Sequence, residues 1–180
     1  MGATGRDVSA GEDLTDGVIA LRPLTLDDAD AHLAGEDEQQ VRWLNDGGHS
    51  TPQTVQRHIE RMLDARRRRI ALWSFGVIEV ASGDLVGNVE GNGLGTLVGV
   101  GTGEANISYV IYPDWRGRGY AVRAVLLLCD FLRQNGIDRA IIRVHPDNVA
   151  SQAVARRAGF VEAGHLHNRF GPLLRFVRTV

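Results

Sequence analysis

Residues 109–121 read YVIYPDWRGRGYA, and this stretch decides the fold. Aromatic and β-branched residues give way to a turn with two glycines, and a helical pattern follows at once. Gly117 and Gly119 leave the N–H groups of the turn unobstructed, while the helix N-terminus adds free N–H groups and a positive dipole end. The stretch predicts a strand–turn–helix unit that holds a pyrophosphate, with Arg116 and Arg118 as candidates for added charge. A tight connection without a ligand is the alternative.

Two familiar phosphate motifs do not describe this turn. The basic residues number 20, and all of them are arginine, so the lysine of a P-loop is missing. The same absence excludes chemistry through a lysine Schiff base. The glycine spacing also differs from the G-x-G-x-x-G pattern of dinucleotide-binding domains.

The flanking sequence mixes strand and helix patterns and predicts an α/β (α+β) domain. Residues 1–17 show no apolar period and are expected to form a flexible N-terminal tail, which leaves 18–180 as the domain. Residues 92–103 are rich in glycine and predict a loop. Helices are expected at 26–34, 52–69, 120–135 and 148–158, and strands at 18–23, 70–80, 85–90, 104–112, 140–144, 160–163 and 173–180.

Composition narrows the class of protein. The chain has 180 residues, of which 43% are hydrophobic and 23% charged, with a formal charge of −2. These values are typical of one globular domain. A single cysteine excludes an intrachain disulfide, and the histidines lack the spacing of a metal site. No apolar run approaches the ~20 residues of a membrane span, and no secretory signal is found. We expect a cytoplasmic protein without metal, membrane or nucleic-acid partners.

A second segment, residues 144–160, reads VHPDNVASQAVARRAGF. Its Asn148 follows a predicted strand, and Ser151 lies one turn into the next helix. With the first stretch, this segment resembles the GCN5-related N-acetyltransferase (GNAT) superfamily. The family's Arg/Gln-x-x-Gly-x-Gly/Ala motif is matched by Arg116, Gly119 and Ala121, and its Asn-x-x-Ser…Gly-Phe pattern by Asn148, Ser151, Gly159 and Phe160.

The resemblance extends over about residues 19–164. Within the superfamily, LRPLTLDDAD (residues 21–30) and the Trp43-Leu44 pair look most like the branch of ribosomal-protein N-terminal acetyltransferases, the RimJ/RimL-like branch. The implied fold is a single domain with a mixed six- to seven-stranded sheet and about four helices. The implied sheet opens as a V between the parallel strands at 104–112 and 140–144.

The implied co-substrate is acetyl-CoA. Its pantetheine arm is expected to pair with the backbone of Tyr109, Val110 and Ile111. Asn148 is expected to bind the same arm, with Ser151 beside it, although a helix cap is the alternative role for Asn148. The pyrophosphate is expected on the N–H groups of Arg116, Gly117, Arg118, Gly119, Tyr120 and Ala121.

The implied chemistry is direct attack of a neutral amine on the thioester, which requires a base, an oxyanion donor and a proton source for the thiolate. Glu104 and Glu90 are the candidate bases, and either acid is alternatively a solvated strand end. A backbone N–H near Val110 is the expected oxyanion donor. Many members protonate the thiolate with a tyrosine, but the corresponding residue here is Ala155. Ser151, Tyr112 or water is expected to protonate the thiolate instead.

Two acceptor classes remain open at this point, a peptide or protein N-terminus and a cationic small molecule such as an aminoglycoside or polyamine. Residues 1–90 hold most of the acidic side chains, which suits a cationic acceptor of either class. A catalytically silent acyl-CoA-binding module is the alternative to an enzyme. The chain is expected to be a monomer or a homodimer.

Overall fold

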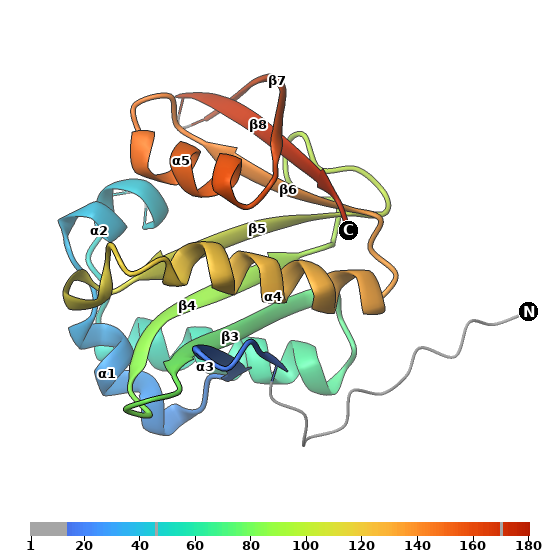
Figure 1. The fold of residues 1–180 in the computed structure, drawn as a ribbon. Helices are drawn as coiled ribbons and strands as arrows, with labels where there is room; N and C mark the ends of the chain where they lie inside the picture. Colours follow the sequence, from blue (N-terminus) through green and yellow to red (C-terminus); the bar gives the residue numbers. More distant parts are fainter. Residues whose placement is uncertain (1–13, 46, 170) are drawn as a thin grey trace, which may run out of the picture.

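The computed structural model describes residues 14–45, 47–169 and 171–180. In these residues eight strands form one mixed sheet, in the order β1-β2-β3-β4-β5-β6-β8-β7 (Figure 1). The strands are β1 (Leu14–Thr15), β2 (Ile19–Pro23), β3 (Leu72–Glu79), β4 (Leu85–Asn92), β5 (Glu104–Ile111), β6 (Arg139–Val144), β7 (Val161–Asn168) and β8 (Gly171–Thr179).

Helices cover both faces of this sheet. They are α1 (Ala29–Ala34), α2 (Glu38–Leu44), α3 (Pro52–Arg67), α4 (Tyr120–Gln134) and α5 (Val149–Arg157). Figure 1 shows α4 lying across the near face of the central strands and α3 behind them. The apolar side of α4 is buried in the main core, whereas α1 and α3 share a smaller apolar cluster. Among the described residues, no helix is long and apolar enough to cross a membrane.

The sheet opens between its two central parallel strands. β5 pairs with β4 along its length, from Gly87 opposite Ile111 to Asn92 opposite Asn106. With β6 it pairs only over its first three residues, which lie opposite Arg139, Ala140 and Ile141. Beyond Asn106 the two strands diverge, so the second half of β5 has one edge without a neighbouring strand. The predicted V-shaped splay is confirmed.

The predicted mixed α/β sheet is confirmed, with differences at its margins. The structure has eight strands rather than six or seven. The predicted tail reached Gly17, but Leu14–Thr15 forms β1 and pairs with β2, so the tail prediction was wrong for that part. The prediction for residues 1–13 lies outside the described residues. The helix α2 was not predicted, because its few turns carry no extended apolar period.

Candidate active site

A cleft of about 1480 Å³ occupies the splay. Its walls are the free edge of β5, the turn before α4, the first turns of α5, and α2. The cleft brings together most of the predicted site residues, namely Tyr109, Val110, Ile111, Arg116, Gly117, Gly119, Tyr120, Ala121, Asn148, Ser151 and Glu90. Glu104 and Arg118 are absent from its described lining.

The turn before α4 presents unpaired N–H groups. Gly117 and Gly119 have φ angles of 78° and 82°, a left-handed conformation that favours glycine. Gly119 caps α4 without any side-chain hydrogen bond to the helix N-terminus. Within the described chain, the backbone N–H groups of residues 117–122 have no protein acceptor. Consecutive N–H groups at a helix N-terminus bind anions, so the turn fits a pyrophosphate.

The two arginines of the turn are engaged with protein groups. Arg116 Nη1 and Nη2 donate to the two carboxylate oxygens of Asp37 at 2.7 and 2.9 Å, and its Nε donates to the Ile111 carbonyl at 2.8 Å. Arg118 lies over the Trp115 ring and near Glu79. Arg116 therefore ties the turn to α2, because Asp37 is the N-cap of that helix and accepts from the N–H of Gln40. Sequence reasoning missed this pair, whose members are 79 residues apart.

Asn148 and Ser151 lie at the start of α5. Asn148 Oδ1 accepts from the Ser151 N–H at 3.0 Å, so the side chain is a helix cap. Its Nδ2 has no protein partner among the described residues and lines the cleft, which leaves it able to donate to a ligand. The capping role and the ligand-binding role are thus compatible.

Tyr109 crosses the splay from β5 to α5. Its hydroxyl lies 2.9 Å from Ser151 Oγ and 3.2 Å from the Ser151 carbonyl. Burial raises the pKa of Tyr109 to about 12, although the hydrogen bond to Ser151 opposes that rise. The phenol therefore keeps its proton at neutral pH. Ala155, one turn further along α5, is fully buried, and Tyr112 bonds to His32 at 2.7 Å outside the described lining of the cleft.

The direction of the backbone groups on β5 narrows the choice of an oxyanion donor near Val110. Hydrogen bonds alternate in direction along a strand, and the Tyr112 N–H donates to Val86 of β4. The regular register between β4 and β5 then directs the Val110 N–H toward β4 as well. The N–H groups of Tyr109 and Ile111 point to the open side. The backbone N–H of Tyr109 and that of Ile111 are therefore the candidate oxyanion donors.

Glu90, on β4, is held by three donors that meet on one oxygen. Its Oε1 lies 2.6 Å from His58 Nε2, 3.0 Å from Ser74 Oγ and 3.5 Å from Asn88 Nδ2. Its Oε2 has no partner among the described residues and is not fully buried. A fixed carboxylate with one free oxygen therefore faces the cleft.

The surroundings of Glu90 keep it ionised. Burial alone would raise the pKa of Glu90, but His58 and Ser74 outweigh that effect and hold the pKa below its usual value of 4.5. Arg61 Nη2 lies 3.2 Å from His58 Nδ1, so His58 has a partner at each ring nitrogen. Sequence reasoning missed His58 and Ser74, since a polar residue beside an apolar helix face or within a strand carries no distinct signal.

Glu104 occupies a different setting. Its carboxylate is nearly buried and contacts Arg139 and Arg175 at 2.9 Å, and it also accepts from the Gly101 N–H. Burial alone would raise the pKa of Glu104, but the Gly101 N–H and Arg175 outweigh it and lower the pKa. Glu104 stands at the start of β5, and its carboxylate links that strand to the glycine-rich loop, to β6 through Arg139 and to β8 through Arg175. The arrangement is that of a structural ion pair.

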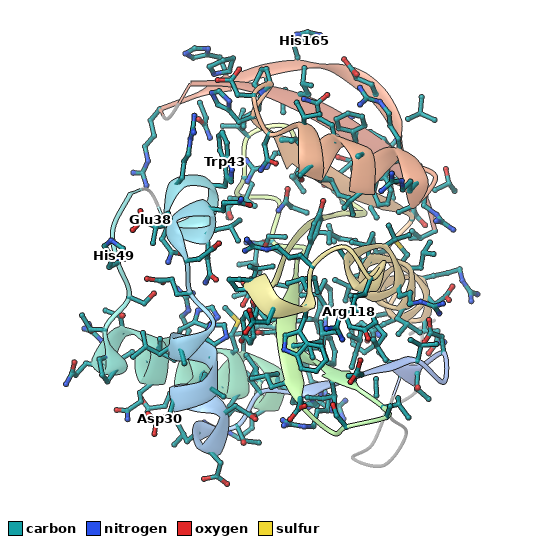
Figure 2. All side chains as sticks on the ribbon, turned by 60° about the vertical axis from the view of Figure 1, so that its left-hand side comes forward. Asp30, Glu38, Trp43, His49, Arg118 and His165 are labelled. Atoms are coloured by element: carbon teal, nitrogen blue, oxygen red, sulfur yellow. The ribbon has the colours of Figure 1, made fainter. Side chains whose placement is uncertain are left out.

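Trp43 closes the cleft from the side of α2. Figure 2 shows it on the side of α2 that faces the C-terminal strands. Its indole lies 5.4 Å from the His145 ring at the end of β6, and the Arg42 guanidinium lies 4.3 Å from the centre of its ring. Within the described ranges, no group of three or more acidic, histidine or cysteine side chains is arranged to hold a metal ion.

Solved structures with the same fold include ribosomal-protein acetyltransferases and an aminoglycoside acetyltransferase. RimL, a ribosomal L7/L12 α-N-protein acetyltransferase in complex with coenzyme A, is 17% identical with a TM-score of 0.79, covering 94% of this chain and 98% of its own. A ribosomal-protein-S5-alanine acetyltransferase from Vibrio fischeri is 15% identical with a TM-score of 0.77, covering 94% and 97%. The aminoglycoside acetyltransferase AAC(6′)-Ib in complex with coenzyme A is 20% identical with a TM-score of 0.73, covering 89% and 94%.

A comparison with curated protein sequences gives no significant match. The sequence profile of one family, described as acetyltransferase (GNAT) domain, matches residues 19–161. This range includes the turn before α4, the start of α5 and both candidate bases. Because the match spans most of the chain and includes the splay, the N–H turn and most residues that line the cleft, the protein belongs to the GNAT family and is an acetyltransferase.

Proposed function

We propose that the protein transfers the acetyl group of acetyl-CoA to a primary amine by direct attack of the amine on the thioester. The family and the unpaired N–H groups before α4 support acetyl-CoA as co-substrate. The turn would bind its pyrophosphate, and the free edge of β5 would pair with its pantetheine arm. The acetyl group would then lie beside Tyr109, near Glu90.

The free oxygen of Glu90 is the observation that carries this proposal. A primary amine reaches the cleft mainly as an ammonium ion, and it must lose a proton before it can attack. Glu90 Oε2 is free to accept a hydrogen bond from that ammonium, because His58, Ser74 and Asn88 all bind Oε1. The carboxylate would hold the ammonium in place and accept its proton, directly or through one water.

The N–H group of either Tyr109 or Ile111 would stabilise the oxyanion that forms on the thioester carbonyl. The departing thiolate of CoA, with a pKa near that of cysteine at roughly 8.5, would accept a hydrogen bond from Ser151 Oγ. Ser151 Oγ lies 2.9 Å from the Tyr109 hydroxyl, and it would accept a hydrogen bond from that group when its own proton is turned toward the thiolate. Because the pKa of Tyr109 is about 12, the phenol stays protonated and acts as a donor to Ser151, and solvent finally supplies the proton to the thiol.

Tyr109→Phe is expected to lower kcat by about fivefold while the KM for acetyl-CoA changes less than threefold, since the hydrogen bond between Tyr109 and Ser151 is worth about 1 kcal/mol. Steady-state thiol release measures both constants. Ser151→Ala should lower kcat by a similar factor, and the double variant should lose little more than either single one. If the loss of kcat in the double variant equals the product of the two single losses, Tyr109 and Ser151 do not act through one shared hydrogen bond.

The acceptor is a cationic amine. Glu38 lines the same cleft as Glu90, and the negative charge of both side chains favours a positively charged ligand. The similar folds include enzymes named for protein N-termini and one named for aminoglycosides, which supports both kinds of amine. The branch resemblance in the N-terminal segments favours a peptide or protein N-terminus.

Thiol release from acetyl-CoA, with product masses, tests the proposal on N-terminal peptides, aminoglycosides and polyamines. Transfer to at least one amine is the expected result, with the product heavier by one acetyl group. Stabilisation by acetyl-CoA without transfer to any amine would overturn the proposal and favour a silent acyl-CoA-binding module.

A further inference from the structure

A second pocket, of about 340 Å³, opens beside Glu90 and shares part of its wall with the main cleft. Unlike a typical small-molecule pocket it is lined mostly by polar side chains. Within the described residues, only Leu44 and Val55 contribute aliphatic groups to the lining. An acceptor that placed an entirely apolar substituent in this pocket would therefore leave many polar side chains of the lining without hydrogen-bond partners.

Gln40, on α2, lines both the pocket and the cleft. The residue is only 8% exposed, and its Oε1 is buried without a hydrogen-bond partner. Neither end of its carboxamide has a partner among the described residues. A buried amide without a partner is costly, and such groups are rare in folded proteins. Rotation about the last side-chain bond exchanges the two ends, so either can be offered to a ligand.

The position of Gln40 is fixed from the cofactor side. The backbone N–H of Gln40 donates to the Asp37 carboxylate at 3.0 Å, and both terminal nitrogens of Arg116 donate to the same carboxylate. Arg116 belongs to the turn that presents the N–H groups before α4. The backbone of Gln40 therefore stands at a set place relative to the reacting thioester, and from that place its carboxamide reaches the wall shared by the pocket and the cleft.

His32 adds a second neutral polar side chain to the lining of the pocket, which also includes the charged Arg61 and Glu90. His32 is 8% exposed, and burial and the nearby His58 lower its pKa, so that it is neutral at pH 7. One of its ring nitrogens bonds to Tyr112 at 2.7 Å, and the other has no partner in the described part of the chain. Gln40 and His32 thus offer neutral groups that can donate or accept a hydrogen bond.

We infer that this pocket binds a hydroxyl group on the carbon next to the one that bears the reacting amine. The inference rests on the proposed function. The ammonium binds Glu90 Oε2, and a hydroxyl two bonds further along enters the pocket, where it donates to or accepts from Gln40. The recognised unit is a 2-amino alcohol. An N-terminal serine or threonine residue contains this unit, and so does an amino sugar.

Matched pairs of amines test this inference and separate the two sources. One pair is a peptide that begins with serine and the same peptide beginning with alanine. The other pair is 2-aminocyclohexanol and cyclohexylamine. We expect kcat/KM to be at least about tenfold higher for the hydroxyl-bearing member of one pair or both, because a site built to bind a hydroxyl rejects the analogue that lacks it. Equal rates within both pairs would overturn the inference and leave the proposed function intact.

Gln40→Met keeps the length of the side chain and removes its polar groups. It should reduce the preference for the hydroxyl to less than threefold, because kcat/KM should fall more for the serine peptide than for the alanine peptide. Gln53→Met, on an exposed part of α3 outside both cavities, is the control and should keep the preference. A preference that survives Gln40→Met would refute the role of Gln40.

Binding supplies a readout that does not depend on transfer. In the presence of CoA, serinamide should raise the melting temperature of the protein more than alaninamide at equal concentration, and Gln40→Met should abolish that difference. If no amine is acetylated but this difference is found, the proposed function fails while the hydroxyl subsite stands. If the two amides act equally, the subsite is refuted whatever the outcome of the transfer assay.

Discussion

Glu90→Gln is expected to lower kcat/KM for the amine at pH 7 by about 10²- to 10³-fold, the range of general-base catalysis. Gln keeps an oxygen that His58 and Ser74 can bind, so the fold around residue 90 should persist. The variant cannot accept a proton or hold an ammonium ion by charge. Thiol release at saturating acetyl-CoA measures the loss.

The pH profile distinguishes this role from a structural one. The pKa of Glu90 is held below 4.5, because its hydrogen-bonded partners outweigh its burial, so the unchanged protein carries the carboxylate throughout the neutral range. In Glu90→Gln the amine must lose its proton to water first. Its activity should therefore rise with pH toward the pKa of the free α-amine, about 8. The ratio of kcat/KM between the unchanged protein and Glu90→Gln should therefore be smaller at pH 9 than at pH 7. A ratio that does not change with pH would contradict the role of Glu90 as the base.

Glu104→Gln is expected to act on stability instead. The carboxylate is 3% exposed and binds both Arg139 and Arg175, so removal of its charge leaves two guanidinium groups without a counter-ion. Both arginines reach solvent in part, so the cost should be about 2 kcal/mol, less than that of breaking a fully buried pair. For a chain of this size that corresponds to a fall in melting temperature of about 4–8 °C. The pH profile of acetyl transfer should remain that of the unchanged protein.

The pH dependence of this stability difference has a defined sign. The Gly101 N–H and Arg175 outweigh burial and place the pKa of Glu104 below its usual 4.5. Ionised Glu104 therefore stabilises the fold above about pH 4.5, and the contribution is lost as the pH falls through the lowered pKa of the folded protein. Thermal unfolding from pH 7 to pH 3 should show the two proteins converge at low pH. A shifted activity profile in Glu104→Gln would instead make Glu104 the base.

The parts of the site that sequence predicted are those built from neighbouring residues. Gly117 and Gly119 precede a helix within one turn, and Asn148 caps the helix that carries Ser151. Each of these arrangements depends on the backbone conformation of a few consecutive residues, so the residue types in that short segment are enough to predict it. The same applies to α4, whose apolar period extends over four turns.

The catalytic assignment required the tertiary structure. Glu90 and Glu104 both stand near the end of a strand, and nothing in the chain separates a base from an ion-pair partner. The difference arises because β5 pairs with β6 only at its start, which brings Glu104 to Arg139 and Arg175, whereas α3 packs beside β4 and brings His58 to Glu90.

Arg116 shows the same division. Local patterns in the chain were enough to place this arginine in a glycine-containing turn before α4 that suits an anion, and the resemblance to the family motifs implied the GNAT fold. The contact of Arg116 with Asp37 is visible only in the folded protein, where Asp37 in turn accepts from the backbone N–H of Gln40 and so ties α2 to this turn. Side chains far apart in the chain meet only after the sheet has closed around its core, and their pairing depends on distances that no sequence period encodes.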